Sequence, residues 1–542
     1  MFRFHLPKRL SVPVASLSLL ALVTLAAVAG YEGRRVAQVV VLALPAVLWL
    51  LWPLKSTRWR SLRFAVAGLL IGLFLIDGAV RAFMRMHYQA SPESSLVLAA
   101  VANTTPREAL EYASSQALTL AGGGAALIAS LWLVAALVGA ANRRSEPLRL
   151  RSRWVFAVLM ALCLAGLLSK PWRRHHPVLF WPNWVASVGE LRSAWSNQEN
   201  ERAKLLANAL AAGARTSMTG PSTVVLVLTD SINRDNMGLY GYSRDTTPHL
   251  AQLAAAERGQ FLKLQHAWSV QPSTLASLSG LFSFGARDED DPVNKTHHLL
   301  ALARAAGYRV WWMSNHDDVA IEQQHARLAD SLEMINREPG RSTAMLDGEL
   351  LDCLKEALID PAPRKLIIVH LLGAHPHYRL RAPADFTPFA EETDGVERDM
   401  MRRGKPAWLR AARRSYDTAI RYHDSVVAET LRLSRHHTPG GGHASWMFLS
   451  DHGQEVGHER VFAGHSPSTA AGYRIPALLW RSAAPFDAAI TSRPFRADWA
   501  GWTLASLMGL QWRGQASELD VLSPSYAWQA PQLQVKAVRY DQ

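Results

Sequence analysis

Long apolar segments in the first 170 residues constrain this chain more than any other feature. A helix needs about 20 apolar residues to cross the hydrocarbon core of a bilayer. Five segments meet or approach that length, namely 11–30, 36–54, 64–83, 117–141 and 154–169. The first ends in Ala27-Val28-Ala29, which resembles a signal-peptidase site, but four apolar segments follow it, so we interpret it as an uncleaved helix. The sequence therefore predicts a domain of five transmembrane helices over residues 1–172.

Basic residues between these segments predict the orientation of the helices. They precede the first segment (Arg3, Lys8 and Arg9), separate the second from the third (Lys55, Arg58, Arg60 and Arg63), and separate the fourth from the fifth (Arg143, Arg144, Arg149, Arg151 and Arg153). Loops rich in Lys and Arg stay in the cytoplasm. The N-terminus is then inside and everything after the fifth segment is outside, although Arg173 and Arg174 fall on the outer side. We attribute much of the net charge of +13 to these clusters and expect no nucleic-acid partner.

The rest of the chain divides into a linker and an α/β domain. Aromatic residues among charges predict an interfacial helical linker over 173–220, with an ordinary helical linker as the alternative. From residue 221 onward, short β-branched apolar runs at 223–230, 308–314, 365–370 and 446–451 alternate with helical patterns such as 298–306 and 408–434. This alternation is typical of a mostly parallel sheet covered on both faces. With only Cys163 and Cys353 in the chain, we expect no disulfide.

Polar residues gather where three of these predicted strands end. Asp230 follows one strand, His375 lies in the loop after another, and Asp451-His452-Gly453 follows a third. Ligands bind at the carboxyl ends of the strands in such sheets. Two aspartates and a histidine with room for a fourth ligand are typical of a catalytic zinc site. Alone, Asp230 would be explained as a helix cap, and His375 and His465 either as surface residues or as metal or substrate ligands.

A hydroxyl at a helix start is the candidate nucleophile. The segment 271–280 opens a predicted helix, with Ser273 and Thr274 near its N-terminus. Free backbone N–H groups and the helix dipole favour a phosphate there. A Ser/Thr-rich helix start is also explained as a simple cap, and the spacing does not choose between the two residues.

Taken together, these motifs resemble the membrane phosphoethanolamine transferases, a branch of the alkaline phosphatase and sulfatase superfamily. The resemblance covers nearly the whole chain. It is carried by the stretch from Arg234 to Pro248, by Asp451 to Glu455 with His465, by Tyr416-Asp417 and Tyr422-His423-Asp424, and by the loop from Asn103 to Ala109.

The resemblance implies a sulfatase-like catalytic domain over 221–542 in the periplasm of a bacterium, anchored in the inner membrane. In the implied reaction, Thr274 attacks phosphatidylethanolamine, holds the phosphoethanolamine group as an ester, and passes it to lipopolysaccharide (lipid A or a core sugar) or another periplasmic glycan. One or two zinc ions would be held by Asp230, Thr274, Asp451 and His452. The transferring phosphate would contact His375 and His465, and the ethanolamine would contact Thr104 and Glu108.

Several departures from the family pattern leave the acceptor open. The lipid A members have Glu where this chain has Asp230, and they carry disulfides and a lysine near 314–317 that this chain lacks. The loop Asn of the family, four residues before the Thr, is Ala100 here. The alternatives are a sulfatase or phosphodiesterase of the same superfamily, a membrane regulator without catalysis, and glycerophosphate transfer. A sulfatase would need a C/S-x-P-x-R string, and none occurs near Thr274.

Overall fold

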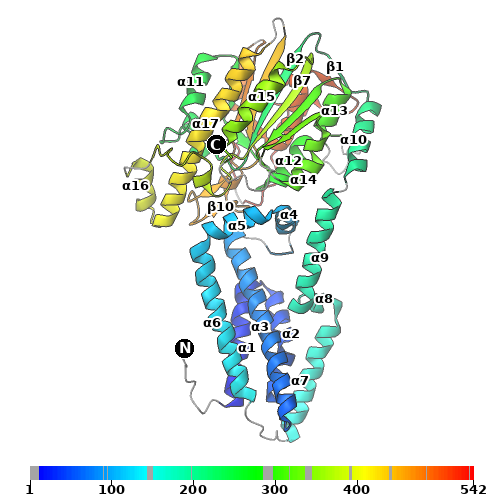
Figure 1. Cartoon of the computed structure of the whole chain (residues 1–542), viewed down its shortest axis with the longest axis vertical. Helices are drawn as coiled ribbons and strands as arrows, with labels where there is room; N and C mark the ends of the chain where they lie inside the picture. Colours follow the sequence, from blue (N-terminus) through cyan, green and yellow to red (C-terminus); the bar gives the residue numbers. More distant parts are fainter. Residues whose placement is uncertain are drawn as a thin grey trace. The chain divides into compact units, whose positions relative to one another are not determined.

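The computed structural model describes residues 11–88, 91–93, 95–142, 150–196, 198–284, 297–316, 318–335, 345–389, 393–438, 442–483, 485–535 and 538–541. The chain divides into two compact units, drawn in Figure 1. The membrane unit comprises 1–102 and 113–191, and the α/β unit comprises 103–112 and 192–542. The short segment 103–112 therefore belongs to the α/β unit although it lies between transmembrane helices in the sequence.

Apolar helices build the membrane unit. The long ones are α1 (Val12–Gly30), α2 (Arg34–Leu51), α3 (Thr57–Tyr88), α6 (Ala117–Asn142) and α7 (Leu150–Leu168). Among the described residues, four are long and apolar enough to cross a membrane, and the apolar part of α7, Trp154–Leu168, is shorter. The chain is thus a membrane protein, as predicted. Its orientation stays a prediction, because Arg3, Lys8, Arg9, Arg143, Arg144 and Arg149 lie outside the described residues.

A buried carboxylate ties the start of the linker to the membrane unit. Asp77 in α3 accepts hydrogen bonds from Tyr31 (2.6 Å), Arg81 (2.9 Å) and the indole of Trp181 (3.0 Å), which lies in α9 (Pro177–Ser196). Ionisable groups within membrane spans are costly unless they are paired. This network gives Asp77 a structural role. The rest of the predicted linker is also helical, with α8 (Lys170–Arg173) and α10 (Glu199–Ala211), and its position at a membrane surface stays a prediction.

A seven-stranded sheet organises the α/β unit. Its order is β3 (Phe261–Leu264), β11 (Ala477–Arg481), β8 (His443–Ser450), β2 (Ser222–Thr229), β7 (Arg364–Leu371), β5 (Arg309–Ser314) and β6 (Ser331–Met334). The strands from β8 to β6 run parallel, whereas β11 pairs antiparallel with both β8 and β3. The predicted mostly parallel sheet is confirmed, and the four predicted strands correspond to β2, β5, β7 and β8.

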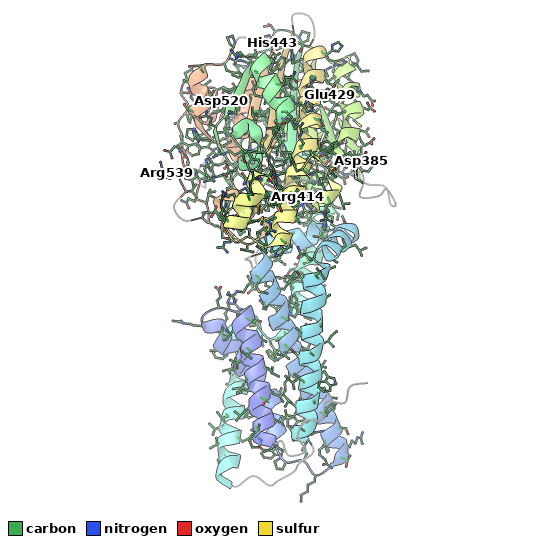
Figure 2. The ribbon with its side chains drawn as sticks, turned by 90° about the vertical axis from the view of Figure 1, so that its left-hand side faces the viewer. Asp385, Arg414, Glu429, His443, Asp520 and Arg539 are labelled. Carbon is green, nitrogen blue, oxygen red and sulfur yellow. The ribbon has the colours of Figure 1, made fainter. Side chains whose placement is uncertain are left out.

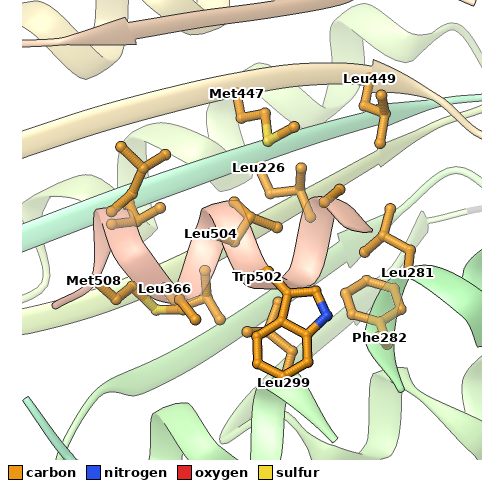
Figure 3. Packing of buried hydrophobic residues seen from close by; sticks show 14 of the residues in the cluster. Leu226, Leu281, Phe282, Leu299, Leu366, Met447, Leu449, Trp502, Leu504 and Met508 are labelled. Carbon is orange, nitrogen blue, oxygen red and sulfur yellow. The ribbon is translucent and has the colours of Figure 1, made fainter. Parts of the chain in front are cut away.

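Alternation along the central strand β2 explains why both faces of the sheet are covered. Val224, Leu226 and Leu228 point into one core cluster, and Val225 and Val227 point into the other. Figure 3 shows the first cluster, where Leu226 and neighbouring strand residues pack on helices of that face. Those helices are α12 (Thr274–Phe282), α13 (Leu299–Ala305) and α18 (Ala500–Leu507). The opposite face is covered by α11 (Pro248–Ala256), α15 (Leu350–Ile359) and the long α17 (Ala407–His436), so the predicted helices at 298–306 and 408–434 are confirmed.

Smaller elements complete the α/β unit. Two-stranded pairs join β1 (Arg215–Thr216) with β13 (Leu510–Gln511), β4 (His266–Trp268) with β12 (Pro494–Arg496), and β9 (Glu455–Val456) with β10 (Ala463–Gly464). The remaining helices, apart from short 3-10 turns, are α14 (Val319–Gln324) and α16 (Gly395–Arg402). The segment 103–112 contains the end of α4 (Ser95–Asn103) and most of α5 (Pro106–Ser115).

The segment 103–112 is anchored to α14 by one side chain. The Oδ1 atom of Asn103 accepts a hydrogen bond from the backbone N–H of Ala320 (3.2 Å), and its amide nitrogen donates to the carboxylate of Asp318. Asp318 is the residue at the N-terminal cap of α14. Asn103 thus satisfies a free N–H group at the start of that helix, as capping side chains do.

Replacing Asn103 should release this anchor. In Asn103→Ala, the Ala320 amide loses its acceptor, so hydrogen exchange at the start of α14 should speed up about tenfold or more. The matched control is Thr105→Ala, which removes a cap from α5 and leaves the Asp318 contact intact. Hydrogen exchange with mass spectrometry on the full chain measures both. Unchanged exchange in α14 would show that Asn103 does not anchor the segment.

Close backbone approach at Gly373 fixes the loop after β7 against the end of β2. Gly373 has φ of +58°, and a Cβ there would lie 2.2 Å from Thr229 Oγ1 and 2.6 Å from the Asp230 carbonyl oxygen. Gly241 also has a positive φ, +96°, but a Cβ there would meet nothing within 4 Å. A side chain at Gly241 would therefore meet only an unfavourable backbone conformation, whereas one at Gly373 would also collide with its neighbours.

Gly373→Ala should therefore destabilise the α/β unit more than Gly241→Ala. Gly241→Ala should cost about 1 kcal/mol, because an L residue disfavours positive φ. Gly373→Ala adds a collision with backbone that has nowhere to move, so we expect about 3 kcal/mol or more. Thermal unfolding of the purified full chain compares the two variants, and equal melting temperatures would refute the collision.

Candidate metal centre

The carboxyl ends of β2 and β8 bring Asp230, Asp451 and His452 together, as predicted. Asp230 follows β2 and is fully buried, and Asp451 and His452 follow the neighbouring strand β8. The parallel pairing of these strands explains the convergence of residues more than two hundred positions apart. Asp451 Oδ1 accepts backbone hydrogen bonds from Ser231 (3.1 Å) and His452, which orients the carboxylate.

Two lone pairs face each other at the centre of this site. The Nδ1 atom of His452 lies 2.8 Å from the carbonyl oxygen of Gly453, which can only accept, so Nδ1 carries the proton. The opposite nitrogen, Nε2, therefore presents a lone pair, and it lies 3.5 Å from Asp451 Oδ2. Among the described residues, neither atom has a hydrogen-bond partner, although both are buried. Buried acceptors without donors are rare in native proteins, and a cation between them resolves the conflict.

Other donors converge on the same point. One ligand atom each of Asp230, His452 and His465 lie within 4.8 Å of one another. The rings of His452 and His465 have centroids 4.4 Å apart, and those of His465 and His375 are 6.3 Å apart. Carboxylate and imidazole donors at this spacing fit a zinc ion. The structure thus brings the two loop histidines of the sequence analysis to the same site.

Thr274 reaches this site from the start of α12. Its hydroxyl donates a hydrogen bond to Asp230 Oδ2 at 2.9 Å, and the side chain is half-buried. Ser273 precedes it as the residue at the N-terminal cap of the helix. The hydroxyl therefore lies beside both the carboxylate cluster and the free backbone N–H groups of a helix N-terminus, where phosphate is favoured.

Burial and mutual charge shift the ionisation of these groups. Burial would raise the pKa of Asp230, but the surrounding imidazoles, His375 first, hold it below its usual range. Burial and the charge of Asp230 raise the pKa of Asp451 to about 6. Burial lowers the pKa of His375 to about 4 and that of His465 to about 3, so both rings are neutral near pH 7. Neutral imidazoles are the form that can accept a proton or coordinate a metal.

The backbone around Asp230 is held by α17. Ser231 has φ of +63°, a conformation that costs a non-glycine residue about 1–3 kcal/mol and clusters at functional sites. Tyr416 locks it, because its hydroxyl donates to the Ser231 carbonyl (2.6 Å) and accepts from the Asn233 N–H (2.8 Å). In return, the Ser231 hydroxyl donates to Asp230. The strained residue therefore orients the carboxylate.

Two buried residues that were not predicted from the sequence, Asp347 and His316, support this site. Asp347 accepts hydrogen bonds from the backbone of Leu372 (2.8 Å) and Gly373 (2.9 Å) and pairs with His423 (3.2 Å). It thereby fixes the loop that carries His375. Its position, outside any strand end, gave no signal in the sequence.

His316 is the second missed residue. It follows β5, stacks on His370 with ring centroids 4.1 Å apart, and lies 3.6 Å from Asp318. Burial alone would lower its pKa, but Asp318 and the charges of Asp230 and Asp451 raise it to about 9. The protonated form of the His316 imidazole is therefore favoured near pH 7. Its place after a predicted strand could have identified it.

Thr104 and Glu108 lie on the segment 103–112. The Thr104 carbonyl accepts a hydrogen bond from Arg192 (3.2 Å). Glu108 accepts from the Thr105 N–H (3.0 Å), and the Glu108 N–H donates to the Thr105 hydroxyl (3.2 Å), forming a capping box at the start of α5. Contact of Thr104 and Glu108 with an ethanolamine group stays a prediction.

Comparison with known proteins identifies the family of this chain. The family model described as Sulfatase matches residues 222–494, just over half of the chain. Phosphoethanolamine transferase EptC of Escherichia coli is 28% identical over 455 residues, covering 78% of this chain and 75% of that protein. Phosphoethanolamine transferase CptA of Salmonella typhimurium is 27% identical over 501 residues, covering 86% and 83%.

Solved structures agree with the fold. The crystal structure of the C-terminal periplasmic domain of EptC from Escherichia coli, in complex with Zn, matches with a TM-score of 0.54 and 28% identity, covering 60% of this chain and 95% of that domain. The integral membrane protein EptA, a lipooligosaccharide phosphoethanolamine transferase from Neisseria meningitidis, matches with a TM-score of 0.56 over 93% of this chain and 98% of its own. At 18% identity, the second match shows the fold alone.

These findings confirm the predicted five-helix membrane domain joined to an alkaline-phosphatase-like domain, and the predicted resemblance to transferase enzymes. The chain belongs to the sulfatase family, as a membrane-embedded enzyme similar to the phosphoethanolamine transferases.

Proposed function

We propose that this enzyme transfers phosphoethanolamine from phosphatidylethanolamine to lipopolysaccharide, or to another periplasmic glycan, through an ester on Thr274. It would act from the bacterial inner membrane with the α/β unit in the periplasm. One observation carries the proposal, namely the Thr274 hydroxyl 2.9 Å from Asp230 at a helix N-terminus, beside the facing lone pairs of Asp451 and His452.

Zinc is the proposed cofactor. Asp230, Thr274, Asp451 and His452 would hold it, and the similar EptC domain has been crystallised with Zn. A bound zinc ion supplies positive charge that favours the deprotonated hydroxyl and offsets the charge of a transferring phosphoryl group. We propose that one or two zinc ions bind.

In the first step, Asp230 accepts the hydrogen bond of Thr274 and aims its oxygen at the lipid phosphorus. The Thr274 oxygen forms a bond to phosphorus, the bond from phosphorus to the glycerol oxygen breaks, and the Thr274 proton ends on the released diacylglycerol. The backbone N–H groups at the start of α12 stabilise the phosphoryl oxygens, and His375 and His465 contact the transferring group. Phosphoryl transfer depends mainly on such positioning and charge stabilisation.

In the second step, an acceptor hydroxyl or phosphate attacks the same phosphorus. Its bond to phosphorus forms, the bond to Thr274 breaks, and the acceptor proton returns to the Thr274 oxygen. Thr104 and Glu108 would contact the ethanolamine, whose cation suits a carboxylate. Retention of a full set of polar residues argues against a regulator without catalysis; the set is Asp230, Thr274, Asp451, His452 and His465.

Substitution of Thr274 tests the nucleophile. Given fluorescent phosphatidylethanolamine and zinc, the purified full chain should release labelled diacylglycerol and gain one phosphoethanolamine on Thr274, as detected by peptide mass spectrometry. Thr274→Ala should lower release at least about a thousandfold, because no other group replaces the nucleophile. Ser273→Ala is the matched control and should retain both activities.

The same assay separates the rival functions. Zinc-dependent release without an adduct on the protein would favour a hydrolase of the family. No turnover and no bound metal would favour a regulator. An adduct that survives in Thr274→Ala but disappears in Ser273→Ala would move the nucleophile by one residue.

Metal affinity tests the ligand set. Asp451→Asn and His452→Ala should each weaken zinc binding by more than about a hundredfold, since second-shell changes alone cost 10–100-fold. The exposed Asp385→Asn is the control, and it should bind zinc as the parent does. We expect His465→Ala to block transfer but to weaken zinc binding less than His452→Ala does, by about ten- to a hundredfold at most. Competition with a chromogenic chelator measures each value. A loss at His465 equal to that at His452 would make His465 a metal ligand.

A further inference from the structure

A basic surface with exposed apolar side chains is formed by α16, the start of α17 and the β9–β10 loop. Met401 at the end of α16, Trp408 in the first turn of α17, and Val461 in the β9–β10 loop are 51%, 55% and 59% exposed. Arg402, Arg403 and Arg460 are exposed next to them in the sequence. These six residues are called the α16 patch.

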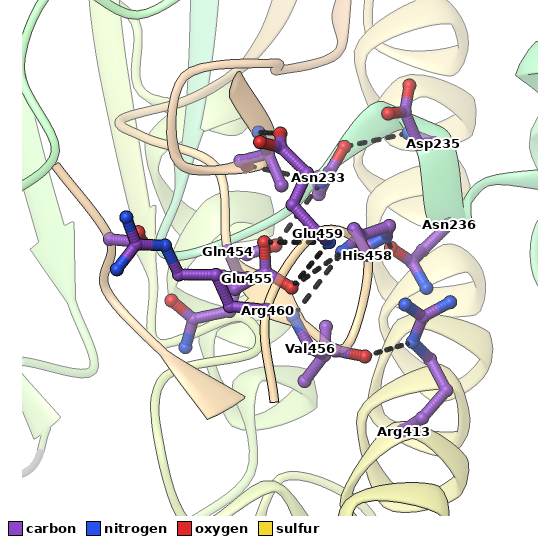
Figure 4. A network of polar contacts seen from close by, with 12 residues as sticks. Asn233, Asp235, Asn236, Arg413, Gln454, Glu455, Val456, His458, Glu459 and Arg460 are labelled. Carbon is purple, nitrogen blue, oxygen red and sulfur yellow. Dashed lines mark hydrogen bonds and ion pairs between the residues drawn. The ribbon is translucent and has the colours of Figure 1, made fainter. Parts of the chain in front are cut away.

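Hydrogen bonds hold the two parts of the α16 patch together. Arg403 donates a hydrogen bond to the His458 carbonyl, and the Lys405 ammonium donates to the Arg460 carbonyl at 3.1 Å. The loop also packs against both helices, since Gly457 lies close to the side chains of Met400 in α16 and Leu409 in α17. Figure 4 shows the start of this loop, where Arg413 of α17 donates a hydrogen bond to the Val456 carbonyl (2.7 Å). The patch is therefore one surface built from two segments.

Charge is strongly biased on this surface. Residues 395–414 contain seven Lys or Arg and two acidic residues, and of the seven only Lys405 and Arg413 are buried. Asp399 pairs with Arg402 (3.1 Å), and Glu397 pairs with Arg414, so the excess of positive charge remains after pairing. Arg402 is 73% exposed. A cationic surface that carries Trp and aliphatic side chains matches the interface of an anionic bilayer, where Trp rings lie at the level of the headgroups.

The α16 patch also lies at the edge of the sheet where the reaction occurs. The β9–β10 loop connects His452 to His465, so Val461 is four residues from a residue of the metal centre. Figure 2 shows Arg414, near the start of α17, at the opposite end of the α/β unit from His443, where β8 begins. The patch therefore belongs to the carboxyl edge of the sheet.

We propose that the α16 patch docks the α/β unit onto the surface of an anionic phospholipid bilayer. Met401, Trp408 and Val461 enter the headgroup region, and the arginines bind lipid phosphates. This docking would bring the metal centre to the lipid surface. It does not depend on the proposed reaction, because it requires no turnover.

Single-cysteine labelling tests the contact. Cys163 and Cys353 are first replaced in the full chain, and then Met401→Cys, Trp408→Cys and Val461→Cys are labelled with an environment-sensitive dye. Each protein is placed in nanodiscs that hold one chain, made of phosphatidylcholine with or without phosphatidylglycerol, with spin-labelled lipids as quenchers. Ile359→Cys is the matched control, because Ile359 is 68% exposed and lies before β7, at the amino edge of the sheet.

We expect lipid quenching at the three patch positions, stronger with phosphatidylglycerol, and none at Ile359. Adding Arg402→Gln to the Trp408→Cys protein should lower the equilibrium constant for the quenched state about fivefold, the effect of one basic residue at an anionic surface. The same quenching should occur with Thr274→Ala. Equal quenching at Ile359, or no lipid quenching at the patch in a protein with unchanged thermal stability, would overturn the proposal. So would protection of the patch only when two chains share a disc, which would indicate a second copy as the partner.

Discussion

The structure depends on the electrostatics of one sheet edge, where Asp230, Asp451 and His452 are buried together. Two carboxylates in a low-dielectric site repel each other, which is why the pKa of Asp451 rises to about 6 beside Asp230. The facing atoms Asp451 Oδ2 and His452 Nε2 are both acceptors, 3.5 Å apart. Without a cation this arrangement opposes folding, so the surrounding structure must hold it in place. A divalent ion would be attracted to both carboxylates and to the lone pair of His452, so the groups that repel each other in its absence would bind it.

The residues that hold this edge of the sheet in place are not themselves proposed to bind the metal or the substrate. Tyr416 in α17 fixes the unfavourable backbone of Ser231, and Asp347 fixes the loop that bears His375. Both act through backbone N–H and carbonyl groups, so they set positions without adding a competing ligand. A group that must be placed within a few tenths of an ångström is best held by buried hydrogen bonds of this kind. The helix α17 therefore serves as a frame for the site as well as a cover for the sheet.

Sequence patterns predicted the parts of the fold that depend on local physics. Apolar length predicted the membrane helices, and β-branched runs predicted β2, β5, β7 and β8, because burial on both faces leaves little choice of residue. The site residues at strand ends followed from the same logic, since parallel strands place their carboxyl ends together. Asp347 and the Asn103–Asp318 bond were not predictable, because each depends on a contact between distant segments that leaves no periodic signal. His316 lay after a predicted strand, yet its charge arises only from neighbours that the fold supplies.

The membrane helices tether the α/β unit to the bilayer, which affects how the site can meet a lipid. The lipid donor proposed above would not diffuse to the site through water, so in the proposed reaction the α/β unit meets it at the bilayer surface. Tethering converts that encounter into an intramolecular one, whose effective concentration depends on orientation as much as on distance. The chain passes between the two units at three places in the sequence, after residues 102, 112 and 191. A cationic, partly apolar patch beside His465 would select the orientation in which the phosphate can reach Thr274. The anionic phospholipids bound by the patch would then belong to the same bilayer as the proposed lipid donor.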